Sequence, residues 1–374
     1  MKERDLIDLL VAAARQGASD LHLTAGAPPM VRVAGVIKLL AEDAEVLSAE
    51  DTRRLVVDTL KEGQRAKLEN EWQLDFALQV GGDLGRYRGN ACYVSGALEA
   101  NFRRIPSEVG DLKSLGHSPV VDKWCDARAG LVLVTGASGE GKSTTMASMA
   151  QTIAQRRSVN IVSIEDPIEF VHSHGRSLFN QREIGSDAHS FASALRNALR
   201  QDPDVILVGE MRDTDTMQTA ITAAETGHLV IATMHTNDAP SAIGRIIDAF
   251  PKEGQQFVAA QLAWSLLGVV CQYLLPRSGD KPGLILATEL MIVNSGIEAC
   301  IRERRLSQIP GLIQRGAADG MHTVDVSLIE LLLDERITLM DAMAHARDPN
   351  FVKEEFQKAL KSQRKGWFTG MFGK

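Results

Sequence analysis

The sequence of 374 residues contains few cysteines, no long apolar run and no excess of positive charge. Its four cysteines are widely spaced and form no C-x-x-C pair, which argues against a zinc ribbon or a redox motif. We expect them to be buried or idle thiols in a reducing compartment. The longest apolar stretch, Ala259–Cys271, is interrupted by Gln261 and Ser265 and is too short to span a bilayer. A formal net charge of −7 gives no electrostatic reason to expect a nucleic-acid partner.

The two ends of the chain bear on where the protein works. Residues Met1–Asp8 alternate charged and apolar side chains and lack the apolar core of a signal peptide. We therefore expect a cytoplasmic protein that meets a membrane only through a partner. Residues 351–374 form a tail that ends in a basic and aromatic stretch, Lys361–Lys374. This stretch is interpreted either as disordered or as a segment that touches a membrane surface or a partner.

Residues 1–104 show the patterns of a mixed α+β module. Apolar residues on one helical face predict a helix over Asp5–Arg15, and a second helix is expected over Ala49–Leu68. Short strands are expected at Leu21–Leu23, Met30–Val33, Asp75–Val80, Gly85–Tyr93 and Leu98–Ile105. Residues 105–119 contain two prolines and two glycines, and we interpret them as a linker between domains.

Residues 120–350 show a different pattern, in which short and nearly continuous apolar runs alternate with helical stretches. The runs are Leu131–Thr135, Asn160–Ile164, Val205–Val208 and Leu229–Thr233. Such runs suit parallel strands that are covered on both faces. Helical patterns at Thr144–Ala154 and Phe191–Arg200 lie between them, which predicts a doubly wound α/β domain. After Pro251 the chain is expected to be mostly helical.

The sharpest motif is Gly136–Ser143, which fits the G-x-x-x-x-G-K-[ST] pattern of a phosphate-binding loop at every fixed position. Its glycines let backbone N–H groups converge on phosphate oxygens, and the following helix adds its positive N-terminus. Lys142 is expected to contact the β- and γ-phosphates, and Ser143 to bind Mg²⁺ through its hydroxyl. The expected nucleotide-binding residues are Gly136, Ala137, Ser138, Gly139, Glu140, Gly141, Lys142, Ser143 and Thr144.

Acidic residues follow two expected strands at their carboxyl ends, where α/β sheets bind ligands. One strand is followed by the cluster Glu165–Glu169, and the other by Gly209 and Glu210. The cluster would repel itself without a cation, although a solvated turn is the alternative reading. Common P-loop ATPases carry an aspartate where this chain has Gly209, so we assign the magnesium role to Glu210. Asp204, at the opposite end of that strand, is interpreted as structural.

Two histidines flank the expected strand Leu229–Thr233. His235 follows its carboxyl end, close to the expected place of the γ-phosphate, and His228 precedes its other end. A lone histidine more often serves packing than chemistry, but its place at the strand end favours function for His235 more than for His228.

Together these motifs resemble the secretion ATPases of type II secretion and type IV pilus systems, over about residues 1–350. The stretches that carry the resemblance are Ala18–Leu23, Gly136–Thr145, Ile164–Glu169, Leu199–Asp213, Ala224–His228 and Thr233–Thr236. Within this family the chain looks most like the PilT-type ATPases that retract pili. Assembly ATPases of the family usually carry an additional N-terminal domain, and many carry a four-cysteine metal insertion.

The resemblance implies a fold and an assembly. A PAS-like α+β module would precede a RecA-like doubly wound ATPase domain with a helical C-terminal part, giving an α/β protein overall. Members of the family assemble as hexameric rings and use ATP and Mg²⁺. The implied partners are an inner-membrane pilus platform protein and, as a further possibility, a paralogous retraction ATPase, at the pilus base.

The resemblance also implies residue roles. Glu169 would be the general base that orients the attacking water, and Glu210 would be the Walker B glutamate. His228 and His235 match the family's histidine box. Arg88 and Arg103 match arginines that reach ATP across domain or subunit boundaries, with ordinary strand-surface charge as the alternative.

One departure from the PilT-type pattern lies at Gly296–Glu303, where the family signature reads A-I-R-N-L-I-R-E. Ile297, Ile301, Arg302 and Glu303 fit it, whereas Glu298, Ala299 and Cys300 do not. An arginine often found soon after the Arg88 strand is also replaced near Gly96. These differences leave open a PilU-like accessory motor. Other readings are an assembly or secretion ATPase of the same family, a non-hydrolysing nucleotide-gated adaptor and, more weakly, a nucleic-acid translocase.

Overall fold

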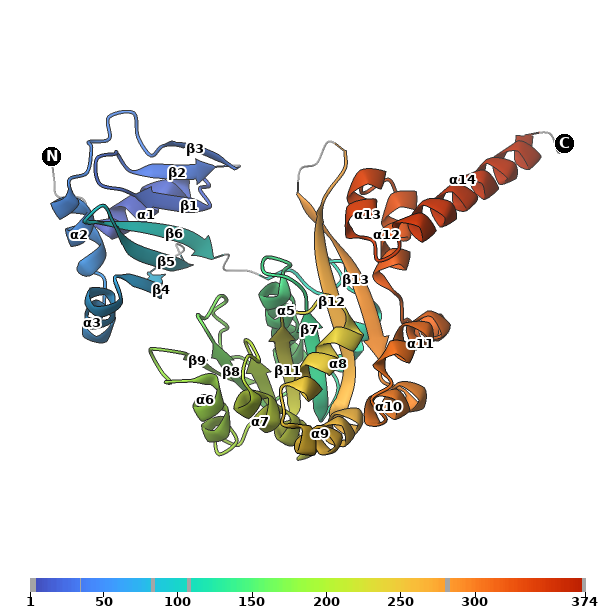
Figure 1. Cartoon of the computed structure of the whole chain (residues 1–374). Helices are drawn as coiled ribbons and strands as arrows, with labels where there is room; N and C mark the ends of the chain where they lie inside the picture. Colours follow the sequence, from blue (N-terminus) through green and yellow to red (C-terminus); the bar gives the residue numbers. More distant parts are fainter. Residues whose placement is uncertain (1–4, 34, 82–84, 106–108, 280–282, 372–374) are drawn as a thin grey trace. The chain divides into compact units, whose positions relative to one another are not determined.

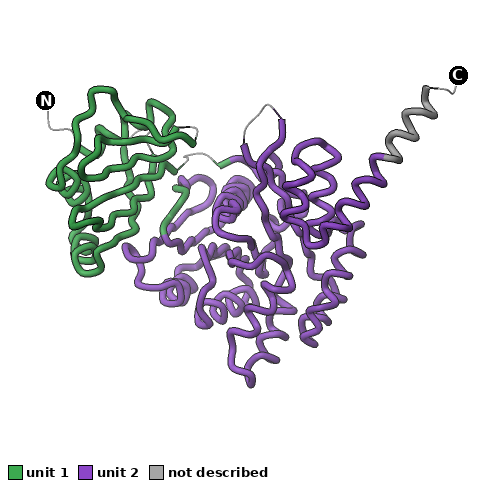
Figure 2. The backbone as a smooth tube through the Cα atoms, turned by 45° about the horizontal axis from the view of Figure 1, so that its top comes forward, with its two compact units in different colours: residues 1–109, 167–171 green, residues 110–166, 172–374 purple. Residues whose placement is uncertain are grey.

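The computed structural model describes residues 5–33, 35–81, 85–105, 109–279 and 283–371, with side chains up to residue 360 (Figure 1). The chain divides into two compact units (Figure 2). The first comprises residues 1–109 and 167–171, and the second comprises residues 110–166 and 172–374.

The first unit is built on an antiparallel sheet in which, over the described residues, six strands follow the order β3-β2-β1-β6-β5-β4. The strands are β1 (Asp20–Leu23), β2 (Met30–Val33), β3 (Val36–Leu39), β4 (Gln73–Val80), β5 (Gly85–Val94) and β6 (Ala97–Ile105). The helices are α1 (Leu6–Arg15), α2 (Ala49–Val57) and α3 (Glu62–Glu71). The predicted mixed α+β organisation is confirmed.

Helix α1 shows why its sequence pattern predicts a helix. Asp5 caps its N-terminus by accepting a hydrogen bond from the Asp8 N–H at 2.8 Å. Leu6, Leu9 and Leu10 recur at helical spacing and are buried in the core of the unit. The predicted helix and its buried face are both confirmed.

Two expectations for this unit were wrong. The helix expected over Ala49–Leu68 is divided into α2 and α3, because the chain turns at Asp58–Lys61 and buries Leu60 in the core. A short strand, β3, was also missed. Its residues are all exposed, so it lacks the alternation of buried and exposed residues that marks a half-buried strand.

The second unit is built on a mostly parallel sheet in which, over the described residues, seven strands follow the order β13-β12-β7-β11-β10-β8-β9. The strands are β7 (Gly130–Thr135), β8 (Asn160–Glu165), β9 (Leu178–Glu183), β10 (Val205–Val208), β11 (Leu229–Met234), β12 (Leu266–Pro276) and β13 (Leu284–Ile292). Each neighbouring pair is parallel except β12 with β13.

Alternate residues of β7 supply two cores, one on each face of the sheet. Leu131 and Leu133 belong to the core formed with α6 (Phe191–Ala198), α7 (Thr214–Glu225), α8 (Ala239–Asp248) and α9 (Lys252–Ser265). Val132 and Val134 belong to the core formed with α4 (Pro119–Trp124) and α5 (Lys142–Arg156). The doubly wound prediction is therefore confirmed, and so are its four central strands.

The expectation of a mostly helical chain after Pro251 was wrong in one respect. The apolar stretch Ala259–Cys271 is divided between the end of α9 and the start of β12, which pairs with β7 and forms a long hairpin with β13. The remaining segments are α10 (Ser295–Arg302), η2 (Leu306–Gln308), α11 (Ile309–Arg315), η3 (Gly316–Asp319), α12 (Val324–Leu333), α13 (Leu339–His345) and α14 (Pro349–Met371). Strand β9 had not been predicted either.

Three smaller expectations concern the cysteines, membrane spans and the tail. All four cysteines are free thiols, and Cys125, Cys271 and Cys300 are buried. Within the described residues, no helix has the length and apolar character needed to cross a bilayer. The backbone of the expected tail is helical up to Met371, as part of α14, whereas the side chains of Lys361–Lys374 lie outside the described residues.

Candidate active site

The loop Gly136–Gly141 connects the buried strand β7 to the N-terminus of α5, as a phosphate-binding loop requires. Gly136 adopts a φ of 144°, and a Cβ atom at this position would lie 2.7 Å from the carbonyl oxygen of Gln272. Only glycine therefore fits between the end of β7 and the neighbouring strand β12. The loop crest, Ala137–Gly139, is exposed and open to a ligand.

Lys142, the first residue of α5, is buried, and its ammonium group is turned inward along the loop. Its Nζ donates hydrogen bonds to the carbonyl oxygens of Gly136 at 2.8 Å and Ala137 at 2.6 Å. These carbonyls hold the positive charge beside the loop, where it can meet a phosphate. The half-buried Ser143 follows directly on the same helix turn.

The Thr145 hydroxyl links the first turn of α5 to two neighbouring residues. It hydrogen-bonds to His117 Nε2 at 2.8 Å and to Gln272 Nε2 at 2.9 Å. Burial lowers the pKa of His117 to about 4, so the imidazole is neutral near pH 7. His117 lies in the stretch 105–119 that we interpreted as a linker, so the end of this stretch is anchored to the helix of the phosphate loop.

Three parallel strands bring their carboxyl ends to the same edge of the sheet. Thr135 of β7 pairs with Met234 of β11, so the phosphate loop and His235 begin side by side. Gly209 follows β10, and its carbonyl oxygen accepts a hydrogen bond from the Thr233 hydroxyl at 2.5 Å. This register places His235 and Glu210 next to the loop.

Gly209 occupies the place where common P-loop ATPases carry an aspartate, and the structure explains the glycine. A Cβ atom there would lie 3.0 Å from the carbonyl oxygen of Ile164 and 3.2 Å from the Cα of Glu165. The Gly209 N–H donates to the same Ile164 oxygen at 2.8 Å. A side chain at position 209 would therefore press against the backbone of β8, and the next residue, Glu210, can present one without this contact.

Glu210 is held by two side chains, Arg212 and His235. Its Oε2 lies 2.6 Å from Arg212 Nη2, and its Oε1 lies 3.2 Å from His235 Nε2. Burial acts to raise the pKa of Glu210, but the hydrogen bond from Arg212 and the charges of His235 and Arg212 more than offset it, and its pKa is lowered. Glu210 is therefore a carboxylate at neutral pH, as a magnesium ligand or a water-orienting group must be.

Two residues beside Glu210 were given no individual role from the sequence. Arg212 pairs with Glu210, and Glu165, buried at the end of β8, accepts hydrogen bonds from Ser163 Oγ at 2.7 Å and Gln181 Nε2 at 3.2 Å. The available signal for Arg212 was its opposite charge two residues after Glu210 at a strand end. Glu165 was visible only as one member of the acidic cluster Glu165–Glu169.

His228 lies at the other edge of the sheet, and the structure does not bring it to the phosphate loop. It precedes β11, and its Nδ1 is 2.9 Å from the carbonyl oxygen of Ala223, near the end of α7. Six residues of extended chain lie between it and His235, so the seven steps span about 23 Å at the usual rise per residue. A role for His228 in nucleotide chemistry stays a prediction.

The predicted base Glu169 lies four residues after β8, in the segment 167–171 that groups with the first unit. It is half-buried. Its role as the general base stays a prediction.

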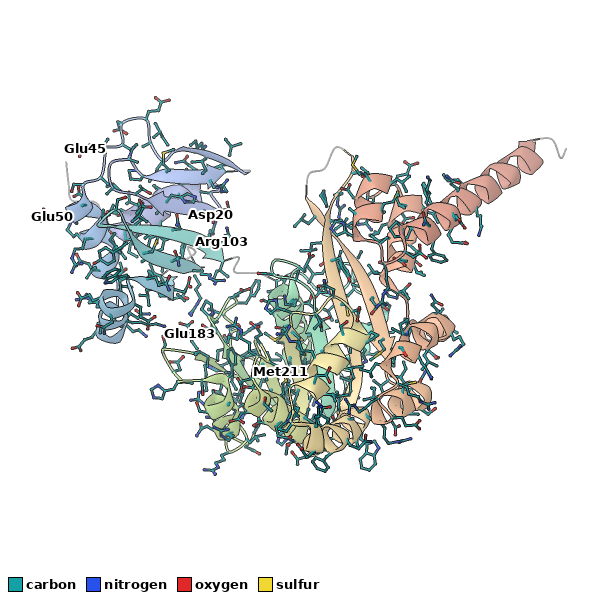
Figure 3. The ribbon with its side chains drawn as sticks, in the orientation of Figure 1. Asp20, Glu45, Glu50, Arg103, Glu183 and Met211 are labelled. Carbon is teal, nitrogen blue, oxygen red and sulfur yellow. The ribbon has the colours of Figure 1, made fainter. Side chains whose placement is uncertain are left out.

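Arg88 and Arg103 are directly opposite each other on β5 and β6 of the first unit. Arg103 Nε also donates to Asp20 Oδ1 at 2.8 Å (Figure 3). Burial acts to raise the pKa of Asp20, but hydrogen bonds from Ser19 and Arg103 more than offset it and lower that pKa. The roles of Arg88 and Arg103 at the nucleotide stay predictions.

The residues at the sheet edge fit a nucleotide with its magnesium ion. The loop cradle and Lys142 suit phosphate oxygens, and Ser143 with Glu210 suits a hard cation. Among the described residues, no group of three or more His, Cys, Asp or Glu side chains could hold a metal by itself.

Comparison with known proteins adds the following findings. Residues 2–305 match the family model described as Type II/IV secretion system protein. The chain is 42% identical to the type IV pilus retraction ATPase PilT of Pseudomonas aeruginosa, over 92% of this chain and 99% of that protein. It is 37% identical to the type IV pilus ATPase PilU of the same organism, over 94% of this chain and 90% of that protein.

A solved structure agrees with these sequences. The crystal structure of the pilus retraction motor PilT with bound ADP superposes with a TM-score of 0.87 at 45% identity, covering 94% of this chain and 99% of that one.

Proposed function

This chain belongs to the type II/IV secretion system protein family, and from that membership we propose that it is an ATP-hydrolysing motor that powers the retraction of type IV pili. One observation carries the proposal. The phosphate loop, Lys142, His235 and Glu210 meet at one sheet edge in a chain that is 42% identical to PilT over nearly its whole length. The higher identity to PilT than to PilU favours the retraction motor over the accessory one.

The chemistry follows from the groups at this edge. The loop N–H groups and the N-terminus of α5 bind the phosphates, and Lys142 stabilises charge that develops at the γ-phosphate. Ser143, and Glu210 through water, would hold Mg²⁺, which neutralises phosphate charge when bound. Glu169 would orient the attacking water, and His235, beside Lys142 and Glu210, would respond to the loss of the γ-phosphate.

The motor proposal includes an assembly and a set of partners. In a homohexameric ring, Arg88 and Arg103 would act on a nucleotide across a domain or subunit boundary. An arginine placed there can stabilise the charge that develops in phosphoryl transfer. Residues 105–119 would be the linker on which the N-terminal module moves. The motor would act on a platform protein of the inner membrane, from the cytoplasmic side at the pilus base, alone or with a paralogous ATPase.

A phosphate-release assay and a deletion strain test the proposal. The purified chain should release phosphate from ATP only with Mg²⁺, and Glu169→Gln should reduce the rate strongly. A deletion strain should keep surface pili and lose twitching. Few pili in that strain would favour an assembly motor, and nucleotide binding without turnover would favour an adaptor.

A further inference from the structure

Residues 235–238 connect β11 to α8, and both ends of this connection are held. At one end, His235 lies beside Lys142 and Glu210. At the other end, Asp238 caps α8 by accepting the Ser241 N–H at 2.7 Å. Between these ends, the Asn237 carbonyl oxygen accepts a hydrogen bond from the Tyr273 hydroxyl, and the His235 carbonyl oxygen accepts one from Arg245 Nη1 at 3.3 Å. Asp238 lies three residues after His235 in this short connection.

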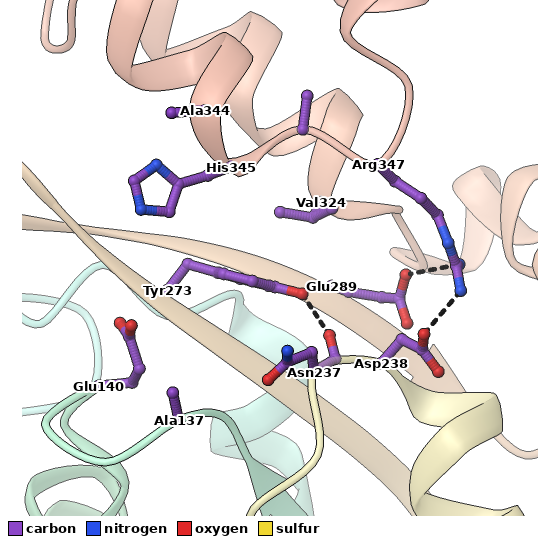
Figure 4. Close-up of a pocket in the computed structure, with 11 residues that line it drawn as sticks. Ala137, Glu140, Asn237, Asp238, Tyr273, Glu289, Val324, Ala344, His345 and Arg347 are labelled. Carbon is purple, nitrogen blue, oxygen red and sulfur yellow. Dashed lines mark hydrogen bonds and ion pairs between the residues drawn. The ribbon is translucent and has the colours of Figure 1, made fainter.

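Arg347, in the turn between α13 and α14, reaches this connection from the C-terminal helices (Figure 4). Its Nη2 donates to Asp238 Oδ2 at 2.7 Å, and its Nη1 lies 3.7 Å from Glu289 Oε2. Glu289 is 1% exposed, and its Oε1 accepts the N–H of Ala239, the first residue of α8, at 2.9 Å. Arg347 thus links two carboxylates that both hold the start of α8.

The backbone of Arg347 is fixed in its turn. Asp325 of α12 accepts the N–H of Arg347 at 2.7 Å and that of Asp348 at 3.1 Å. These two hydrogen bonds fix the backbone from which the Arg347 side chain extends.

A cavity of about 410 Å³ separates these helices from the phosphate loop. Ala137 and Glu140 of the loop line one side, and residues 344–347 line the other (Figure 4). Arg347, Asp238 and Glu289 also line this cavity, so their ion pairs lie at its wall.

We propose that Arg347 is a positioning residue for ATP hydrolysis, which holds the connection 235–238 and through it sets the place of His235 beside Lys142 and Glu210. The inference rests on the proposed function, because it presumes that the site hydrolyses ATP. It predicts that the C-terminal helices influence turnover without touching the nucleotide. Small displacements of groups around a reacting centre are costly, so the effect should appear in kcat. The P-loop itself is untouched, so KM should hardly change.

Steady-state phosphate release from the full chain tests the inference, with the parent, Arg347→Gln, Arg347→Lys and Asp238→Asn compared. Arg347→Gln should lower kcat about three- to tenfold with KM for ATP within about twofold of the parent. Arg347→Lys keeps the charge and should recover part of the loss. Asp238→Asn still caps α8, because asparagine is a good N-cap, but loses the ion pair and should resemble Arg347→Gln.

The matched control is Arg156→Gln. Arg156 is about as exposed as Arg347 and pairs with Asp122 at 2.8 Å, but it lies at the far end of α5. This variant should keep the parental kcat.

The double variant Arg347→Gln with His235→Gln tests whether Arg347 acts through His235. If Arg347 acts through His235, adding Arg347→Gln to His235→Gln should change kcat by less than about twofold. The inference would be overturned if Arg347→Gln lowered kcat as much in the His235→Gln variant as in the parent. It would also be overturned if Arg347→Gln alone kept the parental kcat. A parent chain with no ATPase activity would instead overturn the proposed function, and the inference with it.

Discussion

His235 bridges Lys142 and Glu210, with Nδ1 3.4 Å from Lys142 Nζ and Nε2 3.2 Å from Glu210 Oε1. The imidazole thus joins the cation of the phosphate loop to the carboxylate that follows β10. A phosphate that draws Lys142 away from its loop carbonyls would change the contacts of His235 and, through it, those of Glu210. Under the proposed function, these three side chains would carry a change at the nucleotide to the carboxyl end of β10.

Replacing Glu210 by glutamine should separate binding from turnover. The variant keeps the size of the side chain but loses the charge that pairs with Arg212 and would hold Mg²⁺ through water. We expect kcat to fall by about 100-fold while nucleotide still binds. Phosphate release and the fluorescence of a labelled ATP analogue measure the two quantities. Lys142→Met is the contrasting variant and should lose nucleotide binding as well. If the kcat of Glu210→Gln stayed within threefold of the parent, Glu210 would have no part in the mechanism.

A side chain at Gly209 should destabilise the fold. In Gly209→Ala the new Cβ lies 3.0 Å from the Ile164 oxygen and 3.2 Å from the Glu165 Cα, both backbone atoms of β8 that cannot move aside easily. We expect a loss of about 1–3 kcal/mol in the free energy of unfolding, measured by denaturant titration.

The control for this variant is Gly254→Ala in helix α9, where nothing lies within 4 Å of the new Cβ. Alanine in an open helical position should be neutral or slightly stabilising. Equal stability of the two variants would show that β8 and β10 do not constrain position 209.

The central strands and the phosphate loop could be predicted because their signals are local. Val205–Val208 is a continuous apolar run, and Gly136–Ser143 is a fixed pattern between a strand and a helix. Strand β12 could not be predicted in this way. Its start at Leu266 follows a helix without a break, and the strand depends on pairing with β7, more than 100 residues earlier. Local periodicity does not report such long-range partners.

The same limit applies within the site. Glu210 and His235 were predicted from their places after strands, and the structure puts them in contact. The link from Asp238 to Arg347 spans 109 residues and left no local pattern in the sequence. His228 matched a motif, yet the direction of β11 carries it to the opposite edge of the sheet from the phosphate loop.

The stability of the protein should fall in mild acid because of His117. Burial lowers the pKa of this imidazole from 6.5 to about 4 in the folded chain. Between these values the unfolded chain binds a proton that the folded chain does not, so stability is fully present above about pH 6.5 and is lost as the pH falls towards 4. The full contribution is about 3 kcal/mol.

Melting temperatures between pH 7.5 and 4.5 test this. His117→Asn should weaken the dependence without abolishing it, because burial also lowers the pKa of His172 to about 4. His189→Asn, at an exposed position, is the control and should follow the parent. A slope that His117→Asn leaves unchanged would mean that other groups govern acid sensitivity.

Arg88 provides a test in which activity and stability should move apart. Arg88 is the backbone partner of Arg103 in the β5–β6 register, so both side chains lie on the same face of the sheet, and Arg103 is the one that pairs with Asp20. Removing Arg88 relieves a like-charge contact, so Arg88→Ala should leave the melting temperature unchanged or slightly raised. If the arginine serves the nucleotide in an assembled ring, kcat should nevertheless fall at least tenfold. Lys38→Ala, on the exposed strand β3, is the control and should alter neither quantity. An Arg88→Ala protein that loses stability and keeps its activity would identify Arg88 as ordinary strand-surface charge, because its side chain would then contribute to the sheet and not to turnover.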